Sequence, residues 1–137
     1  MQRVAKAIIY DRSDQMLVLR RSGTHPKYPY HVDFPGGIVE DDENGFEGVK
    51  REIMEEVSLH LNDEIIELVY EKNSPDNFHH ELYITRIDED RPDITLSWEH
   101  SGYDWVSVSD FLKIRESDIA DNYIRTVIEY LSKTIKN

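Results

Sequence analysis

Three glutamates that could share a metal ion lie close together near the middle of the chain. Wound as a helix at about 100° per residue, the segment 45–57 places Glu52, Glu55 and Glu56 on one face, at spacings i, i+3 and i+4. Like charges at these spacings destabilise a bare helix by a few tenths of a kcal/mol per pair, roughly, and a divalent cation reverses that sign. Because carboxylate oxygens are hard ligands, the pattern favours Mg²⁺ or Mn²⁺ over zinc.

The region around these glutamates is strongly acidic. Residues 40–56 contain eight acidic side chains against two basic ones, so six of the chain's twelve net negative charges lie in seventeen residues. One alternative to a metal site is a solvated acidic helix face. A calcium-binding loop is a second alternative, but its twelfth position would be Arg51, where a bidentate glutamate is needed. We therefore exclude the calcium loop.

The amino-acid composition excludes several classes of function. A chain of 137 residues with 39% hydrophobic and 32% charged residues corresponds to one domain, expected over residues 1–137. Its pI of about 4.8 disfavours binding to nucleic-acid polymers and to anionic membranes. The absence of cysteine excludes disulfides and thiolate catalysis. Lys6 interrupts the apolar N-terminal stretch, and no apolar run is long enough to span a membrane. We expect a soluble, cytoplasmic protein, and its oligomeric state stays open.

The elements that must position the glutamates follow from the hydrophobic pattern. Strands are predicted at Val4–Tyr10, Met16–Arg20, Ile65–Tyr70, Glu81–Ile87, Leu96–Trp98 and Asp104–Val108. The first two strands form a hairpin, and Ser101-Gly102 separates the last two. Helices are predicted over residues 45–57 and in the tail from Asp118, where apolar residues recur at helical spacing. Strands before, between and after two helices predict an α/β sandwich around a mixed β-sheet.

Residues 37–59 resemble the Nudix box, which reads G, five residues, E, seven residues and R-E-U-x-E-E-x-G-U, with U aliphatic. The last glycine is replaced by Ser58, and every other fixed position is present. The matching residues are Gly37, Glu43, Arg51, Glu52, Ile53, Glu55, Glu56 and Leu59. Because the motif fixes the spacing of charged groups over 23 residues, a chance match is improbable. Phe34–Gly37 is similar to the family's lead-in, and Glu99-His100 with Trp105 is similar to a downstream segment.

This resemblance implies a metal-dependent hydrolase of nucleoside diphosphate derivatives on a Nudix-type α/β/α sandwich. The three box glutamates, with the carbonyl oxygen of Gly37, would hold one or more Mg²⁺ ions (or Mn²⁺), and Gly36 would shape the lead-in. Glu43 and Arg51 would pair and orient the catalytic set. Glu99 would be a further catalytic carboxylate that binds metal or acts as the general base, and that role stays open.

The resemblance also suggests residues for substrate binding. Arg20 and Arg21 would reach substrate phosphates, with a solvated surface pair as the alternative. Asn122 would read a nucleobase or cap the C-terminal helix. A nucleoside triphosphate ranks first as the substrate because the chain is little longer than the minimal fold. Dinucleoside polyphosphates come second, ADP-ribose or another nucleotide sugar third, and a non-catalytic nucleotide sensor is a different class.

Three further expectations concern single residue types. Ser58 stands where a left-handed helix cap favours glycine, so a serine in that conformation costs about 1 kcal/mol. The histidines His25, His79 and His80 lack the HExxH spacing, and none is assigned to a metal. Both tryptophans, Trp98 and Trp105, are expected in the core.

Overall fold

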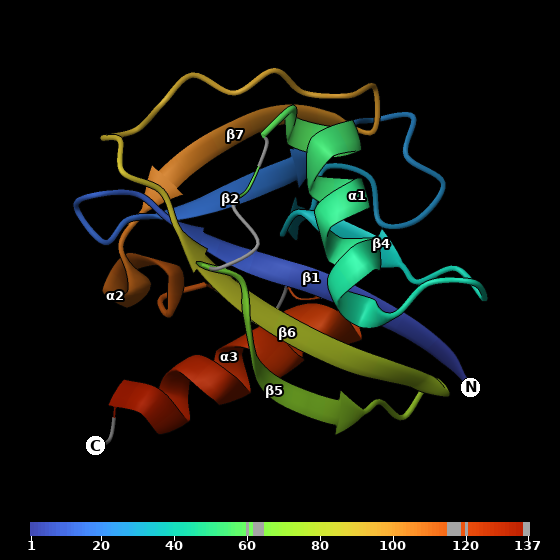
Figure 1. Ribbon diagram of the computed structural model, residues 1–137. Coiled ribbons are helices and arrows are strands. Elements are labelled where there is room, and N and C mark those ends of the chain that lie inside the picture. Colours follow the sequence, from blue (N-terminus) through green and yellow to red (C-terminus); the bar gives the residue numbers. More distant parts are fainter. Residues whose placement is uncertain (60, 62–64, 115–118, 120, 136–137) are drawn as a thin grey trace.

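Helices cover both faces of one mixed β-sheet (Figure 1). The computed structural model describes residues 1–59, 61, 65–114, 119 and 121–135. The strands are β1 Gln2–Tyr10, β2 Met16–Arg21, β3 Val32–Asp33, β4 Gly36–Ile38, β5 Glu67–Asn73, β6 Phe78–Arg86 and β7 His100–Val106. The helices are α1 Gly45–Val57, α2 Val108–Phe111 and α3 Asn122–Ile135. Among these helices, none is both long and apolar enough to cross a membrane.

The sheet divides around a short crossover. Strand β1 runs parallel to β6 along its whole length, and β5 adds antiparallel to the other edge of β6. On its opposite side β1 pairs with β2 only at Tyr10 and Met16, and farther along it pairs with β4. Strand β2 in turn pairs with β3 and β7. The segment 32–38 therefore passes from β2 to β1, where the two strands separate, and carries Asp33, Gly36 and Gly37 to that point.

Alternate residues of β1 face different helices, as the two-residue period of a strand requires. Ala5, Ala7 and Ile9 belong to a core that includes Val49, Ile53 and Val57 of α1, and also Trp105. Ile8 belongs to the second core, with Ile124, Val127 and Leu131 of α3. The α/β sandwich around a mixed sheet is thus confirmed.

Helix α1 has strong signals at both ends. At its start, Glu47 N–H donates to Asn44 Oδ1 (2.8 Å), and Asn44 N–H donates to Glu47 Oε1 (2.9 Å), which forms a capping box. At its end, Ser58 adopts the left-handed conformation (φ 58°, ψ 33°), and its N–H donates to Met54 O at 3.1 Å. Ser58 therefore takes the conformation in which serine is strained, as expected from the motif.

The predicted helix 45–57 is confirmed at both ends, whereas several strand predictions were wrong. Leu96–Trp98 forms no strand, and Trp98 is 67% exposed instead of lying in the core. Ser101 and Gly102 lie within β7, because Gly102 pairs with Arg20 of β2. Val108 begins α2. Strand β5 starts at Glu67 and β6 at Phe78, while the two short strands β3 and β4 were not predicted. Asp118, the expected start of the tail helix, lies outside the described residues.

We predict that Gly36→Ala destabilises the fold by about 3 kcal/mol or more, because it combines backbone strain with a steric clash. Gly36 has a φ of +137°, and a Cβ there would lie 2.3 Å from Ala5 O and 2.4 Å from Lys6 Cα. The control is Gly102→Ala, since a Cβ at Gly102 meets nothing within 4 Å. Urea unfolding should show a change within about 1 kcal/mol for this control. Equal stability of the two variants would contradict the prediction.

Candidate active site

A cavity of about 650 Å³ opens where β1 and β2 separate. Its walls come from the crossover, α1, the loop before β3, the start of β6 and the start of β7. Six residues singled out from the sequence line it: Arg21, Gly36, Gly37, Glu52, Glu56 and Glu99. The structure thus brings carboxylates from α1 and from the segment before β7 to one cavity, although they are more than forty positions apart in the sequence.

Glu56 is a buried carboxyl group, with 4% of its residue surface exposed. Gly36 N–H donates to its Oε1 at 3.4 Å. Its Oε2 has no hydrogen-bond partner among the described residues, and His100 Nδ1, equally without a partner there, lies 3.5 Å away. Burial, with the neighbouring carboxylate of Glu52, raises the pKa of Glu56 from 4.5 to about 10, against the opposing effect of Lys6. Without a cation, Glu56 therefore holds a proton.

A buried network of charges lies beside Glu56 and is centred on Asp33. Lys6 Nζ donates to Asp33 Oδ1 at 2.6 Å, Arg21 Nε to Oδ2 at 3.3 Å, and His100 Nε2 lies 2.9 Å from Oδ2. Burial opposes ionisation of Asp33, but Lys6, His100 and Arg21 outweigh it and hold the pKa of Asp33 well below its usual range. Asp33 is therefore a permanent anion that fixes two cations and the ring of His100.

The sequence analysis missed Lys6, Asp33 and His100 as parts of the site. Lys6 interrupts an apolar strand, and a lysine at such a position is seldom buried unless it is paired. That pattern was the one signal in the sequence, because it predicts a buried carboxylate as partner. The partner itself, 27 residues away, could not be identified without the crossover.

Arg51 organises the exposed side of the acidic helix. It holds Glu43 through two contacts, Nη2 to Oε1 at 2.7 Å and Nε to Oε2 at 3.2 Å. Its Nη1 lies 3.0 Å from Glu52 Oε1 and 3.4 Å from Glu55 Oε2. The hydrogen bond from Arg51 lowers the pKa of Glu43. Arg51 and Glu43 are thus paired, while Glu55 is exposed and does not line the cavity.

The remaining predicted residues have different surroundings. Glu99 is half-exposed at the cavity, with Oε2 3.6 Å from His25 Nε2. Arg20 is exposed and donates to Tyr30 O at 2.6 Å, and it is not part of the cavity wall. Asn122 is the first residue of α3 and hydrogen-bonds Asp76.

The start of α3 is capped by Asp121 instead of Asn122. Asp121 Oδ1 accepts from Tyr123 N–H at 2.8 Å, and its other oxygen accepts from Arg21 Nη2 at 2.5 Å. Arg21 also donates from Nη1 to Lys27 O at 2.9 Å and from Nε to Asp33, so each of its three nitrogens has a partner within the protein.

The arrangement of oxygens fits a hard divalent cation. A Cβ at Gly37 would lie 2.9 Å from Glu52 Cδ, so a larger residue there would displace the Glu52 carboxylate from the backbone. Glu56 Oε2 is a buried ligand atom without a donor among the described residues. Mg²⁺ and Mn²⁺ prefer such carboxylate and carbonyl oxygens.

Comparisons with known proteins agree on one family. The family model described as NUDIX domain matches residues 1–127. The MutT protein from Methanosarcina mazei Go1 is 26% identical, with 99% of this chain and 96% of that chain aligned and a TM-score of 0.77. A C. elegans Ap4A hydrolase, crystallised as a binary complex, is 21% identical over 99% of this chain and 96% of that one, with a TM-score of 0.70.

A third solved structure is larger than this chain. The bifunctional NMN adenylyltransferase/ADP ribose pyrophosphatase from Francisella tularensis, complexed with AMP and a Mn ion, is 22% identical, with a TM-score of 0.72. The alignment covers 93% of this chain and 40% of that one. At such identities the second and third structures establish similarity of fold alone. No protein among curated sequences gives a significant match.

The burial of Glu56 predicts an unusual dependence of stability on pH in EDTA. Because the folded-state pKa of Glu56 is raised from 4.5 to about 10, its protonation stabilises the fold at low pH. That contribution decreases as pH rises above 4.5 toward 10, by up to about 1.4 kcal/mol per pH unit. Urea unfolding between pH 6 and pH 8 should show this loss in the wild type and a flatter profile in Glu56→Gln. Identical profiles would contradict the raised pKa.

Proposed function

Because this chain belongs to the NUDIX domain family of pyrophosphohydrolases, we propose that it hydrolyses the diphosphate linkage of a nucleoside triphosphate with Mg²⁺ or Mn²⁺. One observation carries the proposal: a single cavity is lined both by carboxylates that could bind a metal ion and by groups that could bind a nucleotide. Besides Glu52 and Glu56, the cavity presents Lys27 for phosphate oxygens and the rings of Tyr28 and Phe78 for a base.

The metal ligands we propose are Glu52, Glu56 and the carbonyl oxygen of Gly37, with Glu55 as a further ligand from outside the cavity wall. A bound ion would neutralise phosphate oxygens and lower the pKa of a water molecule for attack on phosphorus. Contacts within the protein orient the carboxylates that would bind this ion.

Two contacts orient the carboxylates that would hold the ion. Arg51 fixes Glu52 through a contact of 3.0 Å, and Gly36 N–H holds one oxygen of Glu56. Glu99 is half-exposed beside His25. We propose that Glu99 accepts the proton of the attacking water, because a carboxylate that water can reach is suited to this task.

The cavity also bears on the size and orientation of the substrate. A volume of about 650 Å³ suits one nucleotide. Lys27 Nζ lies 5.7 Å from the centre of the Phe78 ring, so the loop before β3 reaches the opposite wall of the cavity. Since Arg21 already donates to Asp33, Asp121 and Lys27 O, we propose that it shapes the cavity. Arg20 and Asn122 remain proposed contacts for phosphate and base.

The proposal predicts metal-dependent hydrolysis that depends on Glu56. Phosphate and diphosphate release should be measured from nucleoside triphosphates, dinucleoside polyphosphates and nucleotide sugars, with Mg²⁺, Mn²⁺ or EDTA. Glu56→Gln should reduce kcat by about two orders of magnitude or more, since charge stabilisation in the transition state is lost. The control is Asp42→Asn, which changes an exposed carboxylate of the same acidic segment and should leave kcat unaltered. Metal-dependent nucleotide binding without any hydrolysis would contradict the proposal and favour a sensor.

One observation favours a dinucleoside polyphosphate as a second candidate substrate. Trp98 is 67% exposed and directly precedes Glu99 of the cavity wall, so a second base could stack on its ring. Stacking on an aromatic ring is worth about 1–3 kcal/mol per base. Trp98→Ala should then raise KM for a dinucleoside tetraphosphate about tenfold and leave KM for a nucleoside triphosphate within about twofold. Equal effects on both substrates would exclude this candidate.

A further inference from the structure

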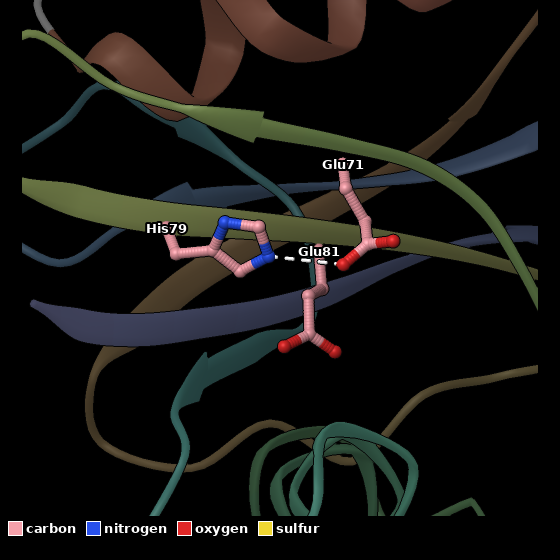
Figure 2. Close-up of side chains that lie close together, drawn as sticks. All are labelled: Glu71, His79 and Glu81. Atoms are coloured by element: carbon pink, nitrogen blue, oxygen red, sulfur yellow. Dashed lines mark hydrogen bonds and ion pairs between the residues drawn. The ribbon is translucent and has the colours of Figure 1, made fainter.

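Strands β5 and β6 hold a second group of possible metal ligands away from the cavity (Figure 2). Glu71, His79 and Glu81 each offer one ligand atom, and these atoms lie within 4.8 Å of one another. Glu71 is the direct partner of Glu81 across the two strands, and His79 lies two positions before Glu81 on the same face. Since all three side chains extend from paired strands, their spacing is fixed by the sheet. None of them lines the cavity.

The imidazole of His79 is oriented by a residue outside the group. Its Nδ1 lies 2.8 Å from Asn73 Oδ1, an atom that only accepts, so Nδ1 carries the hydrogen. In the neutral ring Nε2 then carries a lone pair, and this nitrogen lies 3.0 Å from Glu71 Oε1 (Figure 2). Two acceptors at this distance repel unless a proton or a cation lies between them. Metal-binding histidines usually donate their other ring N–H to a carboxylate, a carbonyl oxygen or water, and Asn73 Oδ1 supplies such an acceptor here.

Glu81 supplies an independent observation. Its side chain is only 9% exposed, and Tyr83 Oη donates to its Oε1 at 2.9 Å. The other oxygen, Oε2, is 3.9 Å from Arg3 Nη1, which is beyond hydrogen-bond distance. Within the described part of the chain, no donor is bonded to Oε2. Oε2 is therefore held by its ion pair with Arg3 and not by a hydrogen bond, which leaves its lone pairs able to bind a cation.

We propose that Glu71, His79 and Glu81 bind a divalent transition-metal ion such as Zn²⁺. One imidazole and two carboxylates suit zinc and its neighbours, whereas Mg²⁺ and Ca²⁺ prefer oxygen ligands alone. Glu81 is paired with Arg3, and Glu71 adds a second carboxylate to the group, so a cation is also favoured by charge. The sequence spacing gave no sign of this site, because its ligands come from two strands.

This ion would act on the turn between β5 and β6. Asp76 in that turn and Phe78 at the start of β6 line the nucleotide cavity. A metal ion that joins Glu71 of β5 to His79 of β6 would hold the two strands together next to the turn. The site is therefore structural and separate from the catalytic carboxylates, and its existence does not depend on the proposed hydrolysis.

Co²⁺ is the probe for testing this site, since its visible absorption reports nitrogen ligation and coordination geometry. The whole chain carrying Glu52→Gln and Glu56→Gln, which weakens the cavity site, should bind one equivalent of Co²⁺ that Zn²⁺ displaces. Adding His79→Asn or Glu71→Gln should abolish this absorption. Asn73→Ala should weaken binding by about tenfold or more, because it removes the group that orients His79.

Matched controls are His31→Asn, in the loop before β3, and Glu67→Gln, at the start of β5. Both should keep the Co²⁺ spectrum and affinity, and circular dichroism in EDTA should show that every variant folds. The proposal is overturned if the Glu52→Gln/Glu56→Gln chain binds no Co²⁺ with nitrogen ligation. It is equally overturned if His79→Asn and Glu71→Gln bind Co²⁺ as the controls do.

Discussion

The burial of the Glu56 carboxyl group is the constraint on which the rest of the site depends. Taking a carboxylate out of water is costly unless hydrogen bonds or a cation compensate it. Here one oxygen receives a long hydrogen bond from Gly36, and the other has no partner among the described residues. The group must therefore hold a proton or face a cation. Gly36 can approach it only because its backbone adopts a conformation with φ of +137° against β1.

The charged network around Asp33 does not neutralise the carboxyl group of Glu56. Asp33 is paired with Lys6, Arg21 and His100, so the positive charge nearest to Glu56 is already committed. His100 lies between the two carboxyl groups, with one ring nitrogen toward each. A proton or an additional cation is thus the remaining partner for Glu56. This explains physically why an acidic helix, unfavourable by itself, is placed at the opening between two strands.

The apolar spacing predicted helix α1 well, because it needs no distant contact, and the capping box found in the structure is equally local. The sequence also placed the carboxylates correctly on one helix, since their spacing is periodic. Prediction from the sequence failed where pairing between residues far apart in the chain determines the structure. Gly102 belongs to β7 because of its partner on β2, and Trp98 is exposed because its segment pairs with no strand. Asp33 gained its role only through Lys6 and His100, which are 27 and 67 residues away from it.

The most direct test of this account is the number of protons released when a metal ion binds. Titration calorimetry of Mg²⁺ or Mn²⁺ binding at pH 7.5, in buffers with different ionisation enthalpies, measures that number. If the cation replaces the proton on Glu56, the wild type should release about one proton per ion, and Glu56→Gln should release none. Metal binding by the wild type without proton release would contradict the account.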